Sequence, residues 1–351
     1  MIAIGDNIIT NPIGDALNRQ LEYANRIGHI DMIVYSTKKL SPKYYKNFHI
    51  YPTNSKNMLT FVFDVLKIAK ILFKQKQIDV ISTQDPFGTA LAGYILKKIY
   101  KTPLHIQNHS SFIDNKKWIK ERFFLFSFFN ILARWLIKRA DRLRVVNHEE
   151  KEKYIKLGVK EDKIDIAPLP IDVDFWNEKR IQNEKPIILW VGRNDKVKNL
   201  KLLFEVVCGF DVELYIVGEM KGYFDLESLE KKYNIKPKYF GVLSHDELKK
   251  LYRKADILLS TSEYEGFGMV MAEAQASGCV VIATNTAGAK EIIIDNKTGF
   301  IVKNKKEFSE KLRVALNGDL ENMKKLSKKY IKRFNKDKMI DDIINSLKKT
   351  K

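Results

Sequence analysis

Short apolar runs alternate with longer amphipathic stretches along almost the whole chain, and this alternation constrains the fold more than any other feature. Runs of this kind are typical of buried parallel strands, and the stretches between them have the periodicity of crossover helices. The predicted fold class is therefore α/β. In the first half we expect helices over 16–28, 61–76 and 88–100, and strands over 1–4, 32–35, 80–82, 104–107, 144–146 and 163–167.

At 351 residues the chain exceeds the length over which one hydrophobic core keeps growing, so two domains are expected. A polar, irregular stretch, NEKRIQNEKP, separates the two halves, and a new apolar strand begins after it at Ile187. We expect two similar α/β domains, an N-terminal one over 1–178 and a C-terminal one over 187–329. In open α/β sheets, ligands bind beyond the carboxyl ends of the strands, so functional side chains are sought directly after strands.

The formal net charge of +19 favours an anionic partner, but most lysines alternate with Asp, Glu and Asn on helix faces that are typical of solvated surfaces. Zinc-finger spacing and an aromatic RNA-binding consensus are both absent from the sequence, so no nucleic-acid partner is predicted. Cys208 and Cys279 lie in apolar runs, which predicts buried free thiols in a reducing compartment. The first residues lack a signal-peptide pattern, and a cytoplasmic location is expected.

The segment 116–142 departs from the alternation of strands and helices. Its central run, 123–129, is rich in aromatic residues and is bracketed by basic residues, yet it is too short to cross a bilayer. One interpretation is a peripheral contact with an anionic membrane surface at the inner face of the cell membrane. The other is a helix buried against the N-terminal sheet, with its cations at the solvated ends.

Two cations follow the strand that begins at Ile187. This strand ends at Gly192, whose missing side chain lets a ligand approach the backbone, and Arg193 and Lys198 come next. Two cations at the start of a helix can neutralise the charge of a diphosphate. Surface cations after a strand are also common, so this pair is weak evidence by itself.

A second group of residues lies in the segment SEYEGFGMVMAEAQASG. Glu265 follows a strand on a glycine-rich loop, and Glu273 lies eight residues later, in the helix that this loop opens. The loop Gly266-Phe267-Gly268 can point N–H groups at a ligand, and a helix N-terminus favours phosphate. Carboxylates placed here can accept hydrogen bonds from sugar or ribose hydroxyls. The alternative is two ordinary surface glutamates near a helix start.

The same two carboxylates raise the question of glycoside hydrolysis. Eight residues of a helix rise about 12 Å, which exceeds the roughly 5 to 9.5 Å between the carboxyl groups of glycosidases. This spacing argues against a hydrolase.

Several segments of the second half resemble the C-terminal domain of the group 1 glycosyltransferases, a retaining family with the GT-B fold. In the family's order and spacing, these segments are GRNDKVKN, LYIVGE, YFGVLS, EGFGMVMAE, SGCVVIATNTAGAKEII and DNKTGFIV. In the first half, QNHSSF and the stretch from ADRLRVVNHEE to IAPLPIDVDFW are similar to segments of the family's N-terminal domain. The resemblance implies two Rossmann-like domains facing each other across a cleft, with a C-terminal helix over 330–351 that returns to the N-terminal domain.

The resemblance also implies roles for single residues. Arg193 and Lys198 are similar to the family's diphosphate-binding pair. Glu265 resembles the carboxylate that contacts the donor sugar, and Glu273 the one that holds the ribose. His109 matches the histidine that faces the reacting sugar, although a lone histidine after a strand is more often structural. Further donor contacts are implied at Gly14, Gly192, Leu243, Phe267, Gly268, Met269 and Val270.

In such enzymes the anomeric configuration is retained, and the departing diphosphate takes the proton of the acceptor hydroxyl. The resemblance implies a hexosyltransferase that uses a nucleotide sugar, such as a UDP- or GDP-sugar, without a metal or another cofactor. The acidic pair in Asp172-Val173-Asp174 lies before the linker, so it is not predicted to bind a metal. The first loop, NPIGDAL, has Gly14 alone where family members commonly carry two glycines, which leaves the acceptor contact open.

The implied acceptor is a glycan or a lipid-linked intermediate of a cell-surface polysaccharide or lipopolysaccharide. Two other classes of function stay open. A protein of this fold that has lost catalysis would bind an anionic membrane or nucleic acid, although the sequence retains both cations and both glutamates of the site. A sugar-phosphate synthase or an epimerase would share the architecture and act on a different substrate.

Overall fold

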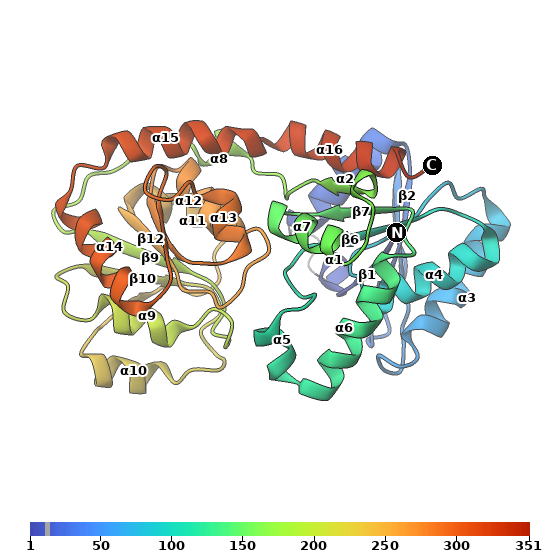
Figure 1. The fold of residues 1–351 in the computed structure, drawn as a ribbon, viewed down its shortest axis with the longest axis horizontal. Coiled ribbons are helices and arrows are strands. Elements are labelled where there is room, and N and C mark those ends of the chain that lie inside the picture. Colours follow the sequence, from blue (N-terminus) through green and yellow to red (C-terminus); the bar gives the residue numbers. More distant parts are fainter. Residues whose placement is uncertain (11–14) are drawn as a thin grey trace. The chain divides into compact units, whose positions relative to one another are not determined.

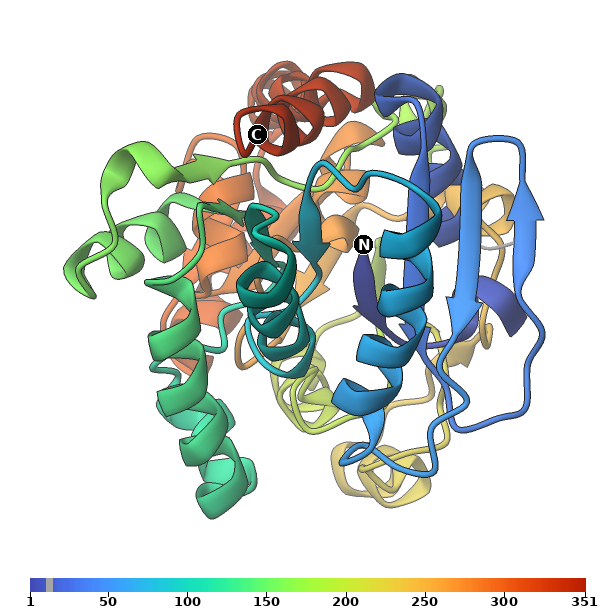
Figure 2. The same ribbon diagram turned by 90° about the vertical axis from the view of Figure 1, so that its right-hand side faces the viewer.

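The computed structural model describes residues 1–10 and 15–351 (Figures 1 and 2). The chain divides into two compact units, one formed by Met1–Pro168 with Met339–Lys351 and the other by Leu169–Lys338. Each unit holds one mainly parallel sheet with helices on both faces, which confirms the predicted α/β fold class. Over the described residues, every helix is too short or too polar to span a bilayer.

The first unit is built on an eight-stranded sheet with the order β3-β4-β2-β1-β5-β6-β7-β8. The strand β3 is antiparallel to β4, and the other pairings are parallel. The predicted strands are confirmed, but the hairpin of β3 and β4 was missed because its first strand is a polar, largely exposed run. The strands are β1 (Ile2–Ile4), β2 (Ile30–Tyr35), β3 (Lys43–Tyr45), β4 (Phe48–Pro52), β5 (Ile81–Thr83), β6 (Leu104–Asn108), β7 (Arg142–Val145) and β8 (Ile164–Ile166).

Helices cover both faces of this sheet, as Figure 1 shows. The helices α3, α4 and α6 pack on one face around a core that includes Val65 and Leu136, and α2 and α16 pack on the other around Ala24 and Ile344. Because both faces are covered, β2 buries apolar side chains on both sides, whereas β5, β6 and β7 also bury polar ones, namely Ser82, His105, Gln107 and Arg144. The helices are α1 (Asn7–Thr10), α2 (Asp15–Ile27), α3 (Phe61–Gln75), α4 (Gly88–Tyr100), α5 (Lys116–Glu121), α6 (Phe123–Ile137), α7 (His148–Lys156) and α16 (Lys336–Lys348).

The second unit is built on a parallel six-stranded sheet with the order β11-β10-β9-β12-β13-β14. Its strands are β9 (Ile187–Val191), β10 (Glu213–Val217), β11 (Lys238–Tyr239), β12 (Ile257–Ser260), β13 (Val280–Thr284) and β14 (Phe300–Val302). Its helices are α8 (Val173–Trp176), α9 (Leu200–Val207), α10 (Leu226–Tyr233), α11 (His245–Lys254), α12 (Met269–Ala276), α13 (Ala287–Ile292), α14 (Lys305–Asn317) and α15 (Glu321–Ile331).

The strand order of the second unit sets the place of its ligand site. From β9 the chain proceeds outward to β10 and β11, and it then returns to β12 on the other side of β9. The loops after β9 and β12 therefore leave the sheet side by side and turn in opposite directions. Such a switch point is where open α/β sheets bind their ligands.

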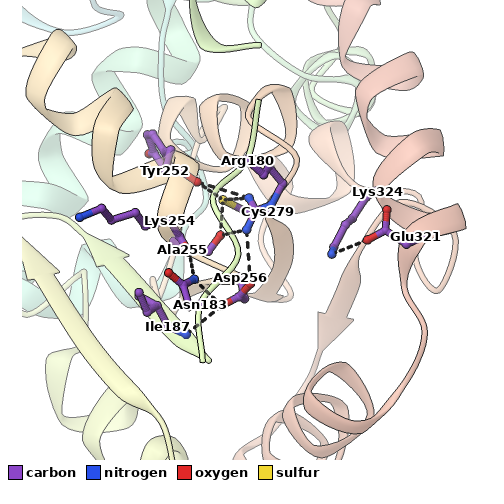
Figure 3. A network of polar contacts seen from close by, with 10 residues as sticks. All are labelled: Arg180, Asn183, Ile187, Tyr252, Lys254, Ala255, Asp256, Cys279, Glu321 and Lys324. Atoms are coloured by element: carbon purple, nitrogen blue, oxygen red, sulfur yellow. Dashed lines mark hydrogen bonds and ion pairs between the residues drawn. The ribbon is translucent and has the colours of Figure 1, made fainter. Parts of the chain in front are cut away.

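The polar segment that leads into β9 is hydrogen-bonded to the end of α11 and to the residues that follow it, within the second unit (Figure 3). Arg180 and Asn183 donate to backbone carbonyls at the end of α11, with 3.3 Å from Arg180 Nη1 to Tyr252 O and 2.6 Å from Asn183 Nδ2 to Lys254 O. Asp256 accepts from the backbone N–H of Ile187 at 2.9 Å. This segment thus has fixed partners, which its irregular polar sequence did not indicate.

The two cysteines are free, but they differ in exposure. Cys279 is buried next to β13, and its thiol donates to the carbonyls of Tyr252 and Ala255 at 3.2 Å each. Burial raises the pKa of the Cys279 thiol. The expectation that Cys208 is buried was wrong, because it follows the last residue of α9, where the chain turns out to solvent.

Candidate functional site

The two predicted groups of the second unit meet at the switch point between β9 and β12. Lys198 Nζ lies 2.6 Å from Glu265 Oε2, and about a quarter of each side chain is exposed. The two residues are 67 positions apart in the chain. They meet because the loop after β9 carries the lysine and the loop after β12 carries the glutamate.

Further hydrogen bonds join these two loops. The backbone N–H of Glu263 donates to Val197 O at 2.7 Å, and Asn199 Nδ2 donates to Glu263 Oε1 at 2.8 Å. Thr261 Oγ1 donates to Lys198 O at 2.7 Å. The backbone that positions Lys198 is therefore fixed from both sides.

Arg193 lies in the same loop but extends into solvent. Its side chain is 77% exposed, and Nη2 lies 3.2 Å from Asp195 Oδ2. An exposed ion pair of this kind contributes little to stability. The Arg193 guanidinium is therefore available to an anion that enters the loop.

Asn194 is a positioning residue that the sequence did not reveal. Its side chain is buried, donates from Nδ2 to Met220 O and Phe224 O at 2.8 Å each, and accepts from Phe224 N at 2.9 Å. The chain after β10 also approaches closely, since a Cβ on Gly218, at φ +125°, would lie 1.9 Å from Gly192 O. The loops after β9 and β10 are thus packed backbone to backbone, and this requires a glycine at 218. At Gly192 an added Cβ would instead lie 2.9 Å from the Trp190 ring.

The predicted glycine-rich loop ends at the start of α12. Gly268 is the N-cap residue at φ +87°, a conformation that favours glycine, and Met269 and Val270 form the first turn of the helix. Phe267 is buried, and its ring packs edge-on against Phe334 at 5.1 Å between centroids. The helix N-terminus adds a partial positive charge beside the Lys198–Glu265 pair.

Glu273 lies in the second turn of α12 and is 6% exposed, so it is not an ordinary surface glutamate. Its Oε2 accepts a hydrogen bond from the buried Tyr252 hydroxyl at 3.1 Å. Burial and the neighbouring Glu273 raise the pKa of Tyr252 well above its usual range, so the phenol stays a donor. Tyr252 was not predicted, because it comes from α11 and meets α12 only in the fold.

The helical separation of about 12 Å expected between Glu265 and Glu273 is wrong, so it does not exclude a glycosidase. It assumed a continuous helix from Glu265 to Glu273, but α12 begins at Met269 and the left-handed Gly268 precedes it. Glu265 lies in the loop, so its distance from Glu273 is not a helical rise.

Leu243 lies in the short connection between β11 and α11 and is half-buried. The next residue, Ser244, caps α11 through the predicted capping box. Glu247 N donates to Ser244 Oγ at 3.3 Å, and Ser244 N donates to Glu247 Oε2 at 2.8 Å.

His109 belongs to the first unit, where it directly follows β6. It is half-buried, and its Nδ1 has no hydrogen-bond partner among the described residues. Burial and the nearby Arg144 guanidinium lower the His109 pKa to about 3, so the imidazole is neutral at physiological pH. Gly14, the other residue predicted here, lies outside the described residues.

Other buried ionisable groups occupy the same edge of the first unit. Asp85 follows β5, and burial raises its pKa. Glu150, in α7, accepts from Asn108 Nδ2 at 3.2 Å, and burial raises its pKa too. Arg144, on β7, donates to Gln107 Oε1 at 2.5 Å and to Ala167 O at 2.7 Å. None of these three groups was predicted, because an isolated Asp, Glu or Arg in a strand, a helix or a loop carries no distinctive signal.

One group of side chains over the described residues has the composition of a metal site. His29, Asp31 and His49, at the other edge of the first sheet, place one ligand atom each within 4.8 Å of one another. Lys76 Nζ lies 2.9 Å from Asp31 Oδ2 and 3.2 Å from His29 Nε2. The Lys76 ammonium therefore already pairs with the groups that would bind a metal ion. Asp172 caps α8 by accepting from Phe175 N at 3.0 Å.

Family models match both halves of the chain. The model described as glycosyl transferases group 1 matches residues 174–333, and that of Glycosyltransferase Family 4 matches residues 22–175. A Klebsiella pneumoniae protein, described as an uncharacterized 41.2 kDa protein in the cps region, is 32% identical over 255 residues, 68% of each chain. An uncharacterized glycosyltransferase of Methanocaldococcus jannaschii is 27% identical over 284 residues, 78% of this chain and 77% of its own.

Several solved structures share the fold at low sequence identity. Sucrose-phosphate synthase from Thermosynechococcus elongatus superposes with a TM-score of 0.78 at 18% identity, over 97% of this chain and 96% of its own. The lipopolysaccharide outer core galactosyltransferase WaaB has the same TM-score and identity, over 98% of both chains. Anabaena HepE, solved with UDP and glucose, has a TM-score of 0.75 at 15% identity, over 99% of this chain and 98% of its own.

Proposed function

The chain belongs to the group 1 glycosyltransferases and has the GT-B fold, and we propose that it is a retaining hexosyltransferase. The donor is a nucleotide sugar, such as a UDP- or GDP-sugar. The acceptor is a glycan or a lipid-linked intermediate of a cell-surface polysaccharide or lipopolysaccharide. The Klebsiella relative from a cps region supports this class of product.

The observation that carries the proposal is the meeting of Lys198 and Glu265 at the switch point of the second sheet. In the proposed complex, the donor diphosphate lies between Lys198, Arg193 and the N-terminus of α12. These groups neutralise the charge that develops on the diphosphate as the bond to the sugar breaks. Glu265 then accepts hydrogen bonds from hydroxyls of the departing sugar.

Glu273 holds the ribose in this proposal. A ribose offers two neighbouring hydroxyls, and a carboxylate can accept from both. Tyr252 supports this role, because its hydrogen bond to Oε2 fixes the rotamer of the buried glutamate. We also propose the donor contacts that the family resemblance implies, at Gly192, Leu243, Phe267, Gly268, Met269 and Val270.

His109 contributes a neutral imidazole from the first unit. Since its pKa is lowered to about 3, it exchanges hydrogen bonds with a sugar hydroxyl and does not protonate the substrate. Gly14 would contact the donor phosphates from the same unit.

We propose that transfer needs no divalent metal, because Arg193 and Lys198 supply the positive charge at the diphosphate. The diphosphate oxygen takes the proton of the acceptor hydroxyl, which attacks on the face that the leaving group vacates. Retention of the anomeric configuration follows from this geometry.

A sugar-phosphate synthase is the second candidate. A probable sucrose-phosphate synthase of Thermosipho melanesiensis is 27% identical over 308 residues, 80% of this chain and 71% of its own. In that case the acceptor is a sugar phosphate in solution, and the same donor site is used.

The test starts with thermal shift against a panel of nucleoside diphosphates and nucleotide sugars. A ligand at 100 times its dissociation constant raises the free energy of unfolding by about 2.7 kcal/mol. Turnover of the stabilising nucleotide sugar is then measured against water, a sugar phosphate and a lipid-linked glycan, each with and without EDTA. Stabilisation by no nucleotide would contradict the donor site, and loss of turnover in EDTA would contradict the metal-free mechanism.

A further inference from the structure

The helix α6 has two apolar faces, of which one is exposed. Ala133, Leu136 and Ile137 are fully buried in the core of the first unit. The exposed apolar side chains are Phe123, Phe124, Leu125, Phe128, Ile131 and Trp135. Figures 1 and 2 show that α5 and α6 project away from the sheet of their unit. The buried face agrees with the interpretation of a helix packed against the sheet, and the exposed apolar face needs a separate explanation.

Four of the exposed side chains form a continuous stripe. Phe124, Phe128, Ile131 and Trp135 follow one another at spacings of four, three and four residues, which places them on one side of a helix. Their exposed fractions are 88%, 60%, 68% and 39%. Contiguous apolar surface of this kind marks an interaction site in a folded protein.

The helices α5 and α6, which carry the stripe, are well packed against each other. The ring of Trp118, from α5, stacks on Phe126 of α6 at 4.4 Å between centroids and on Phe87 at 5.3 Å. Asn115 caps α5, and Asn130 donates to Asp114 at 2.9 Å. The exposure of the stripe is therefore a feature of a packed hairpin and not of a frayed helix end.

Positive charge surrounds the stripe. The segment 114–139 carries seven basic residues and two acidic ones, Asp114 and Glu121, and its basic residues are Lys116, Lys117, Lys120, Arg122, Arg134, Lys138 and Arg139. The Arg139 guanidinium lies over the exposed Trp135 ring at 3.9 Å. Aromatic rings flanked by cations are typical of helices that lie in the headgroup region of a bilayer.

We propose that the hairpin of α5 and α6 docks this protein on an anionic lipid bilayer, with the stripe in the acyl boundary and the cations on lipid phosphates. The 15-residue helix α6 is too short to cross the bilayer, so the contact is peripheral. A second copy of the chain is disfavoured as the occupant, because two stripes meeting face to face would also bring their basic rims together. The proposal rests on the lipid-linked acceptor proposed above and names the surface on which that acceptor is found.

The first test is co-sedimentation of the full chain with vesicles, without donor. We expect binding to phosphatidylcholine vesicles that contain phosphatidylglycerol, weak binding to pure phosphatidylcholine, and loss of binding as salt is raised. The double variant F124S/F128S should bind at least roughly tenfold more weakly. Lys120→Gln and Lys138→Gln should each weaken binding roughly fivefold. The control V314S/L326S removes exposed apolar side chains from α14 and α15 and should bind as the unchanged protein does.

The second test uses the tryptophans. Trp118, Trp176 and Trp190 are at most 6% exposed, whereas Trp135 is 39% exposed. Brominated lipid should therefore quench the fluorescence of Trp135, and W135F should lose this quenching while it keeps its fold. Equal binding by F124S/F128S, or quenching that persists in W135F, overturns the proposal.

Sedimentation velocity tests the alternative that a second copy of the chain covers the stripe. A dimer that F124S/F128S converts to a monomer, without vesicle binding by either protein, would assign the stripe to self-association and overturn the proposal. Since vesicle binding is measured without donor, its failure is distinguishable from failure of the donor site, which is tested by nucleotide binding.

Discussion

The carboxyl edges of the two sheets hold charge in opposite ways. In the second unit, Lys198 and Glu265 form a partly exposed ion pair, and Arg193 extends into solvent. In the first unit, burial lowers the pKa of His109 and raises the pKa of Asp85, and both shifts favour the neutral form of the side chain. The difference teaches that charge is partly exposed at the edge of the second sheet, where the diphosphate is proposed to bind, and that His109 and Asp85 are desolvated at the edge of the first.

The largest effect on turnover is expected for Lys198→Ala, which removes a cation from the carboxyl edge of the second sheet. Lys198→Ala should lower kcat/KM for nucleotide-sugar turnover by about 10²- to 10³-fold, because a cation aimed at developing charge is lost. Lys196→Ala is the matched control, since this exposed lysine lies in the same loop, and it should leave turnover unchanged. Normal turnover in Lys198→Ala would remove the basis of the comparison.

The next effect concerns the buried carboxylate of the same edge. Glu273→Gln keeps the side-chain volume and an oxygen for Tyr252, but it loses the charge. We expect the dissociation constant for the donor, measured by titration calorimetry, to rise about 10- to 100-fold, because a charge-assisted hydrogen bond is replaced by a neutral one. Tyr252→Phe should mainly lower the free energy of unfolding, by about 1 kcal/mol. Unchanged donor affinity in Glu273→Gln would place the ribose elsewhere.

The variant Asn194→Ala tests whether the loop that carries Arg193 and Lys198 depends on the buried hydrogen bonds of Asn194. Asn194→Ala removes three hydrogen bonds and leaves the carbonyls of Met220 and Phe224 without this partner. The free energy of unfolding in urea should fall by about 2 kcal/mol. Lys221→Ala, an exposed change in the facing loop, should alter it by less than about 0.5 kcal/mol. Equal stability of the two variants would show that the hydrogen bonds of Asn194 do not stabilise the fold.

The last effect is on stability alone and concerns His105, which lies near the start of β6 and away from the carboxyl edge. Its ring bonds Ser82 Oγ at 3.1 Å and Ser346 Oγ at 3.0 Å, and burial, with Arg144 nearby, lowers its pKa to about 3. Between pH 6.5 and 3 the unfolded chain therefore binds the extra proton, so the stability from neutral His105 is complete above pH 6.5 and is lost as pH falls. The loss is about 1.4 kcal/mol for each pH unit. Urea unfolding at pH 7.5 and 5.0 should show a shallower pH dependence for His105→Gln, and an equal one would contradict the lowered pKa.

Much of the fold and part of the site could be predicted from the sequence. The strands of both sheets were predictable because buried parallel strands are apolar runs, whereas β3 was missed because it is polar and exposed. Arg193, Lys198 and Glu265 could be singled out because each follows a strand. Tyr252 and Asn194 could not, because an ordinary residue on a helix or loop becomes part of a site only through partners far along the chain.

By itself, the sequence determined the α/β class, the order of strands and helices, and the charges that follow each strand. It also determined that the segment 116–142 is apolar and basic. Only the tertiary structure decided that Lys198 meets Glu265, since that contact depends on β9 and β12 being neighbours. It also decided which face of α6 is buried, and which carboxyl and imidazole groups are desolvated, because both depend on the elements that pack around them.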